Sequence, residues 1–229
     1  MPMSRLTLQQ IRDTARTITD TETDDVSDTL LNLYIQDGYN RIIDLERRWP
    51  FLEVSFTMTT VQDQRSYDID DFTSDTIRDV VSLVDDTNVR LEWIGYDLAE
   101  ETFIRSADGP ARPTYVAFWG GQLHLFPRPM GAYTLNVRAY REPSDWVGSG
   151  GTVDGPDSFD LPLVWYAVSH IYLAQEAPQM AANYERQFND AVAFARRDIM
   201  KPDSYSPVVL SSGSWKHRWR NWHTTDYGS

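Results

Sequence analysis

The spacing of apolar residues predicts helices at the two ends of the chain and strands in its centre. From Thr29 to Arg48 the apolar residues recur at intervals of three and four, which is the period of an α-helix. Ser27 or Asp28 is the expected N-cap, and Trp49-Pro50 ends the helix because the residue before a proline is pushed out of the helical region. The apolar stripe is wide, so we expect this helix to pack on more than one side. Its members are Leu30, Leu31, Leu33, Tyr34, Ile35, Tyr39, Ile42, Ile43 and Leu45.

A shorter helix is expected before this one. Ser4 or Thr7 can cap a segment that carries Leu6, Leu8 and Ile11. The stretch TITDTETDDVSDT follows it, and we interpret this stretch as an acidic linker.

The central part of the chain changes to a period of two, which is typical of half-buried strands. LEVSFTMTTV and AYTLNVRAYR both alternate apolar and polar residues, and TIRDVVSLV and NVRLEWI are short strands joined by a turn at residues 85–87. TYVAFWGGQLHLF predicts a hairpin, because Gly120 and Gly121 can both take a positive φ. One face of the first strand carries Leu52, Val54, Phe56 and Met58.

The last third of the chain returns to a helical pattern. Residues from Leu161 to Ala174 are apolar on several faces, which predicts a buried helix. Pro178 begins a second helix that runs to about Met200, because proline is favoured in the first turn of a helix. The periodicity ends after Pro202.

This order of elements predicts an α+β fold. We expect the N- and C-terminal helices to form a small bundle, with an antiparallel β-meander inserted between them and an extended C-terminal arm. The expected divisions are 1–26 for the short helix and acidic linker, 27–201 for the main domain and 202–229 for the arm. Within the main domain the helices are expected at 27–49 and 161–200, and the β-region at 52–142.

Composition limits the possible classes of function. The chain of 229 residues is 41% hydrophobic, which is enough for a core. Its net charge of -13 argues against a broad nucleic-acid-binding surface, because phosphates are held by Lys and Arg. The chain has no cysteine, no apolar signal segment and no run of about 18 apolar residues. We therefore expect no membrane insertion, and a protein made and used in a cytoplasm.

The sequence contains no convincing pattern of catalytic or metal-binding residues. His124, His170, His217 and His223 have no metal-binding partner at a useful spacing; we expect His124 to face solvent and His170 to be a core histidine. DIDDFTSD lacks the glycine and the terminal glutamate of a calcium loop. No cofactor and no enzymatic activity are expected.

The order of segments along the chain resembles that of the head-to-tail adaptor (neck or connector) proteins of tailed bacteriophages. A helix ending in RRWPFLE is followed by the hairpin module RPTYVAFWGGQLHLFPRPMGAYTLNVRAYREP. A pair of C-terminal helices then carries the stripe Ala182, Tyr184, Phe188 and Ala191. The similarity covers roughly residues 25–200 and consists of hydrophobic spacing and order rather than one diagnostic motif.

The resemblance implies a ring, usually a dodecamer, that assembles under the portal, extends the DNA channel and offers a platform for the tail or a second neck protein. The protein is then a virion component made in the host cytoplasm, with DNA only as passing cargo. Apolar helix faces can supply inter-subunit contacts, although burial inside one subunit competes with this interpretation. The residues named for such contacts are Leu30, Tyr34, Tyr39, Trp119 and Trp146.

The end of the chain is the expected portal-docking arm. Trp215, Trp219 and Trp222 are spaced by four and three residues, which places them on one face of a helix. Lys216, Arg218 and Arg220 flank that face. Trp and Arg are the residues most enriched among interface hot spots, which makes this segment a candidate for portal binding. Folding back onto its own subunit is the competing interpretation.

Two other functions remain open from the sequence. A tail-tube, tail-terminator or other neck protein would use similar α+β modules. A carbohydrate- or cell-surface-binding module is suggested by aromatic residues such as Trp119 and Trp146.

Overall fold

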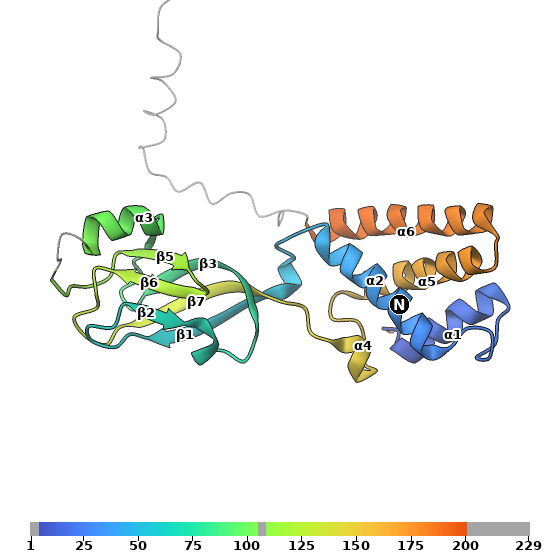
Figure 1. The fold of residues 1–229 in the computed structure, drawn as a ribbon, viewed down its shortest axis with the longest axis horizontal. Helices are drawn as coiled ribbons and strands as arrows, with labels where there is room; N and C mark the ends of the chain where they lie inside the picture. The colour runs from blue at the N-terminus through green and yellow to red at the C-terminus, as the bar shows by residue number, and fades with distance from the viewer. Residues whose placement is uncertain (1–4, 105–108, 201–229) are drawn as a thin grey trace, which may run out of the picture. The chain divides into compact units, whose positions relative to one another are not determined.

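Four long helices form a bundle in the computed structural model, which describes residues 5–104 and 109–200. The helices are α1 (Leu8–Thr19), α2 (Asp28–Asp44), α5 (Asp160–Ala174) and α6 (Pro178–Ile199). The central helix is α5, which packs against each of the other three, and α5 and α6 run side by side (Figure 1). Because it has neighbours on several sides, α5 is apolar on several faces, as the sequence predicts.

The first helix is longer than expected and belongs to this bundle. A capping box begins it: the Gln10 backbone N–H donates to Thr7 Oγ1, and the Thr7 N–H donates to Gln10 Oε1 at 2.8 Å. The helix continues to Thr19, into the stretch that we expected to be linker. Leu8, Ile11 and Ala15 continue its apolar face, and this face is buried in the same core as α2 and α5.

The second helix begins as predicted but ends earlier. Ser27 is its N-cap and accepts a hydrogen bond from the Leu30 N–H. The helix ends at Asp44 rather than near Arg48, and the chain then turns so that Trp49 is fully buried. The indole N–H of Trp49 donates to the Ile43 carbonyl at 3.3 Å, which ties the ring to the end of the helix.

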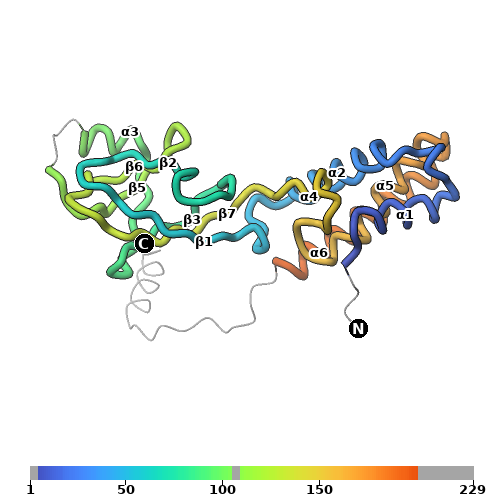
Figure 2. The backbone as a smooth tube through the Cα atoms, turned by 90° about the horizontal axis from the view of Figure 1, so that it is seen from below, coloured from blue at the N-terminus to red at the C-terminus, as the bar shows by residue number. Residues whose placement is uncertain are grey.

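The β-region consists of two sheets, not the expected meander. One sheet has the order β1-β7-β3 and the other β2-β6-β5-β4. Figure 2 traces the path of the backbone through these strands. A meander pairs strands that are neighbours in sequence, whereas here only β4–β5 and β5–β6 do so, and β4–β5 is parallel. The strands are β1 (Glu53–Thr59), β2 (Ser66–Asp68), β3 (Ile77–Asp85), β4 (Glu92–Trp93), β5 (Tyr115–Trp119), β6 (Gln122–Phe126) and β7 (Thr134–Arg141).

The two sheets share one hydrophobic core. Met58, Leu83 and Val137 come from the first sheet, and Val116 and Leu123 come from the second. The predicted alternation holds in β1 and β7, where every second side chain faces this core. The β5–β6 hairpin is also confirmed, with Gly120 and Gly121 both at positive φ. The α+β class that the sequence predicts is therefore confirmed.

Short helical segments connect the larger elements. α3 (Tyr96–Ala99) is followed by a π-helical turn at Glu100–Ile104, and α4 (Trp146–Ser149) lies between β7 and α5. Single turns of 3₁₀-helix occupy Pro50–Leu52, Ile69–Asp71 and Asp157–Phe159.

Candidate assembly surfaces

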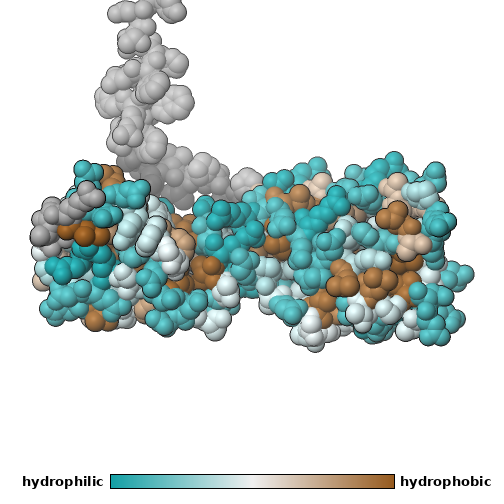
Figure 3. Space-filling view, in the orientation of Figure 1, coloured by the Kyte–Doolittle hydropathy of each residue, from teal (hydrophilic) through white to brown (hydrophobic). Residues whose placement is uncertain are grey.

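The helical bundle carries large apolar side chains on its surface as well as in its core. Leu33 on α2 and Phe194 on α6 are each 62% exposed. Figure 3 shows apolar patches on the face of the helices that it displays. Tyr34 stacks on His170 at 4.9 Å and Gly38 contacts Tyr166, so α2 and α5 are antiparallel. The exposed large apolar side chains of the bundle helices or their ends include Leu30, Leu33, Leu45, Leu173, Met180 and Phe194.

Two of the residues expected at subunit contacts are instead in the core of the subunit. Tyr39 and Trp146 are almost fully buried, and their rings meet edge to face at 5.6 Å. The Tyr39 hydroxyl donates to the Asp154 carbonyl at 2.7 Å, which gives its polar end a partner inside the fold. Neither side chain is therefore available to a second subunit. Leu30 and Trp119 are exposed and Tyr34 is half-buried, so for these three the inter-subunit role stays a prediction.

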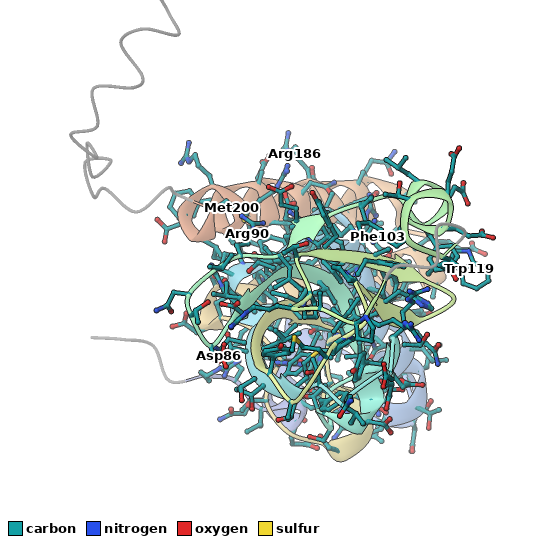
Figure 4. The ribbon with its side chains drawn as sticks, turned by 90° about the vertical axis from the view of Figure 1, so that its left-hand side faces the viewer. Asp86, Arg90, Phe103, Trp119, Arg186 and Met200 are labelled. Atoms are coloured by element: carbon teal, nitrogen blue, oxygen red, sulfur yellow. The ribbon has the colours of Figure 1, made fainter. Side chains whose placement is uncertain are left out.

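An aromatic cluster supports Trp119 at the surface of the second sheet. Trp119 is 59% exposed, and its inner face stacks on Tyr96 with ring centroids 4.9 Å apart. Tyr96 in turn meets His124 edge to face, and Phe103 stacks on Phe126. Figure 4 shows Trp119 and Phe103 toward one side of the view. A large ring held in one orientation loses little conformational entropy on binding a partner, which makes this cluster a candidate contact.

His124 is buried, in contrast to the expectation that it faces solvent. The alternation fails because both faces of β6 are covered: Leu123, His124, Leu125 and Phe126 are all buried. Nε2 of His124 lies 3.2 Å from the Trp119 carbonyl, so Nε2 carries the proton and Nδ1 accepts from the Ser66 hydroxyl at 3.0 Å. Burial lowers the pKa of His124. The residue therefore fixes the hairpin as a neutral hydrogen-bonding group.

A cleft of about 480 Å³ opens between the segment after α2 and the strands β3, β4 and β5. It is rich in arginine: Arg47, Arg48, Arg78 and Arg90 line it, with Asp79 as the one acidic lining residue. Its apolar lining includes Trp93 and Phe118. Phe118 and Trp119 are neighbours on β5 and point to opposite faces, and Figure 4 accordingly shows Arg90 away from Trp119.

Sequence reasoning did not find this arginine cleft. The paired Arg47-Arg48 after a helix was visible, but Arg78 and Arg90 lie 30 or more residues further along the chain. Arg90 is brought beside β3 by the turn after that strand, where the Leu91 N–H donates to the Leu83 carbonyl, and Arg48 is held there by its ion pair with Asp79. A net charge of -13 also directs attention away from any basic site.

Comparison with known proteins decides the family. Nothing among curated proteins matches the chain. The family model described as SU10 adaptor protein matches residues 6–210, which is most of the chain. The chain belongs to this adaptor family. The protein is thus a phage adaptor, as its resemblance to head-to-tail adaptors predicts.

The family match covers more of the chain than the similarity to head-to-tail adaptors expected from the sequence. The range 25–200 leaves out α1, whereas the match begins at residue 6 and includes this helix. That agrees with the packing of α1 in the bundle core. At the other end the match stops at residue 210, within the expected arm at 202–229 and before its tryptophans.

The docking residues predicted at the end of the adaptor lie outside the described part of the chain. Their role in portal binding stays a prediction. They are Trp215, Lys216, Arg218, Trp219, Arg220 and Trp222.

Membership of an adaptor family is typical of a structural protein rather than an enzyme. Within residues 5–104 and 109–200, no helix has the length and apolar character needed to cross a membrane. Over the same described stretches, no group of three or more His, Cys, Asp or Glu side chains is arranged to hold a metal ion.

Proposed function

We propose that this adaptor assembles into a ring under the portal, extends the DNA channel and provides a platform for the tail or a second neck protein. The observation that carries the proposal is the family match over residues 6–210. The protein then resides in the neck of the virion after synthesis in the host cytoplasm. By the resemblance to head-to-tail adaptors, the ring is a dodecamer.

Exposed apolar side chains on the bundle support a ring. In a closed ring, one face of each subunit contacts a different face of the next subunit. Leu33, Leu173 and Phe194 lie on different helices and are largely exposed. Such side chains are suited to burial between copies, because exposed apolar clusters on a soluble protein mark interaction sites.

The acidic composition supports a channel that DNA passes without binding. With -13 charges per subunit, a ring repels the phosphate backbone instead of gaining affinity by counterion release. We propose that part of this charge faces the lumen. A lumen measured as neutral or basic, with the acidic residues confined to the outer rim, contradicts this part of the proposal.

The arm at residues 202–229 is proposed to dock on the portal. Three tryptophans provide large apolar anchors, and three basic side chains beside them can meet an acidic surface. A segment that becomes ordered on binding needs such anchors to offset the loss of conformational entropy.

Electron microscopy of the full chain mixed with its portal protein tests the function. The expected result is an additional ring on the portal, coaxial with the channel. A variant that lacks residues 212–229 is expected to keep its fold and to lose attachment. No added ring with the full chain contradicts the adaptor proposal, and unchanged attachment of the truncated chain contradicts the role of the arm alone.

A further inference from the structure

The arginine cleft stands out electrostatically in an acidic protein. Four of the lining residues are arginines and one is an aspartate, although the chain as a whole has a net charge of -13. Guanidinium groups bind carboxylates and phosphates through two parallel hydrogen bonds. A concave, locally basic surface of this kind is a binding site for an anionic group.

Part of the hydrogen-bonding capacity of the cleft is unused. Arg48 pairs with Asp79 at 2.8 Å, and Arg90 Nη2 donates to the Val81 carbonyl at 3.3 Å. In the described residues Arg47 is exposed and has no ion pair, and Arg78 Nη1 is buried without an acceptor. The exposed guanidinium of Arg47 is therefore open to an occupant that supplies carboxylate oxygens.

The apolar lining restricts the kind of occupant. The indole N–H of Trp93 donates to the Val81 carbonyl at 3.3 Å, which holds the ring beside the arginines, and Phe118 lies next to it. At about 480 Å³ the cleft accepts a short peptide segment rather than a double helix. The overall negative charge also opposes a long polyanion. These features favour a compact acidic loop of a protein.

The chain itself carries such a loop, between α1 and α2. This acidic loop, residues 20–25, contains Asp20, Glu22, Asp24 and Asp25, all of them exposed. None of the four forms an ion pair with the described residues. The turn is fixed by its own hydrogen bonds, since Asp25 Oδ2 accepts from the Glu22 N–H at 2.9 Å and the Val26 N–H donates to the Glu22 carbonyl at 3.1 Å. A preformed turn loses little entropy on binding.

The loop cannot reach the cleft of its own subunit. The loop precedes the N-terminus of α2, and Arg47 and Arg48 follow the C-terminus of the same helix. α2 has 17 residues, so loop and cleft are separated by about 25 Å of rigid helix. A loop of one copy that enters the cleft of another therefore makes a contact between two different faces, which is the head-to-tail geometry that a ring requires.

We infer that the acidic loop of one adaptor copy binds in the arginine cleft of the next copy. The inference rests on the proposed ring. It identifies two surfaces of that ring: Glu22 and Asp24 of one subunit meet Arg47 and Arg90 of its neighbour. The exposed apolar side chains of the helices are a separate part of the interface.

Disulfide trapping tests the contact directly, because the natural chain has no cysteine. Full-length Asp24→Cys and Arg47→Cys variants are mixed and oxidised, with and without portal protein. A disulfide-linked heterodimer is expected in at least one of these conditions, with a lower yield in high salt. The matched control pairs Asp24→Cys with Gln62→Cys, an exposed position outside the cleft, and is expected to give only background.

Charge exchange provides a second test that a folding defect cannot imitate. One variant carries Glu22→Arg with Asp24→Arg, which leaves the turn-forming Asp25 intact, and the other carries Arg47→Glu with Arg90→Glu. Each variant alone places like charges opposite each other at every contact. It is therefore expected to associate at least about tenfold more weakly than the natural chain. In a mixture both kinds of contact are again complementary, so association recovers.

The outcomes separate this inference from the proposed function. Rings of the natural chain on the portal, without the heterodimer and without recovery in the mixture, overturn the inference and leave the adaptor function standing. A missing ring for the natural chain contradicts the function itself. A short labelled DNA duplex is the remaining probe. The inference is wrong, and the occupant is nucleic acid, if three results come together. The duplex binds the natural chain, the Arg47→Glu/Arg90→Glu variant loses this binding, and the mixture of the two charge variants does not recover association.

Discussion

Arg141 and Asp154 form a two-point ion pair that joins the sheets to the bundle. Nη1 of Arg141 lies 2.8 Å from Oδ2 of Asp154, and Nη2 lies 2.8 Å from Oδ1. Asp154 Oδ2 also accepts from the Ser144 N–H at 2.6 Å, and the Asp154 carbonyl accepts from the Tyr39 hydroxyl. Asp154, in the segment that precedes α5, thus connects Arg141 at the end of β7 with Tyr39 of α2. Burial raises the pKa of Asp154, but the hydrogen bonds from Arg141 and Ser144 outweigh it, so the pKa is lowered overall.

The first prediction concerns removal of this pair. The two side chains are 19% and 14% exposed, so Arg141→Met leaves a largely buried carboxylate without its cation. We expect the free energy of unfolding to fall by about 2–4 kcal/mol, measured by urea denaturation. Arg138→Met is the control, because the Arg138–Glu53 pair is 58% and 32% exposed and surface pairs contribute at most about 1 kcal/mol. Equal losses in the two variants contradict the special role of Asp154.

The second prediction concerns the turn after β3. Burial raises the pKa of Asp85, but hydrogen bonds from Val89, Thr87 and Arg112 outweigh it and lower the pKa to about 2. Because the folded pKa is below the unfolded value of about 3.9, the carboxylate stabilises the fold above that value, and this stabilisation is lost as the pH falls toward 2. We expect Asp85→Asn to destabilise the protein at neutral pH.

Unfolding of both proteins is followed between pH 7 and about pH 3, across the unfolded pKa. The difference in the free energy of unfolding between the natural chain and Asp85→Asn is expected to stay constant down to about pH 5 and to shrink below it. A difference that does not change with pH would mean that Asp85 acts through its shape and not through its charge.

Local chemistry explains which elements the sequence predicts. Ser27 as a cap, Pro178 at the start of α6 and the Gly120-Gly121 hairpin follow from short-range geometry, and all three agree with the structure. Strand order does not follow in this way. β7 pairs with β1 across about 80 residues and with β3 across about 60, and no local pattern specifies such partners.

The prediction of side-chain exposure fails for the same reason, because it depends on which distant segments pack together. His124 alternates with leucines, which predicts an exposed side chain if one face of β6 meets solvent. The structure covers both faces of that strand, so the alternation carries no information there. Trp146 illustrates the same error: the sequence marks it as a candidate contact residue, but the ring packs on Tyr39 from a distant helix.

The third prediction tests the close packing of α2 on α5. A Cβ added to Gly38 would lie 2.8 Å from Cδ1 of Tyr166, within the helix pair that also holds the Tyr34–His170 stack. Gly38→Ala is therefore expected to lower the free energy of unfolding by about 1–3 kcal/mol, although alanine favours helix formation. Thermal unfolding followed by circular dichroism measures the change. Gly95→Ala is the matched control, because nothing lies within 4 Å of its added Cβ. A stabilised Gly38→Ala protein contradicts this packing.

The last prediction separates assembly from folding on the bundle surface. Leu33 is 62% exposed, so Leu33→Glu is expected to leave the free energy of unfolding almost unchanged. If Leu33 is buried between copies, the same change places a charge in an apolar contact and weakens association by about 2 kcal/mol or more. Sedimentation velocity of the purified chain and ring counts on portal particles measure the effect.

Gln62→Glu is the control for Leu33→Glu, because it adds the same charge at an exposed site outside the helices. The control is expected to assemble as the natural chain does, since a charge that remains in solvent meets no apolar partner. If Leu33→Glu assembles as well as Gln62→Glu, this part of α2 faces solvent in the ring. The other exposed apolar side chains of the helices, beginning with Leu173 and Phe194, are then replaced by glutamate one at a time, because only a site buried between copies responds to the added charge.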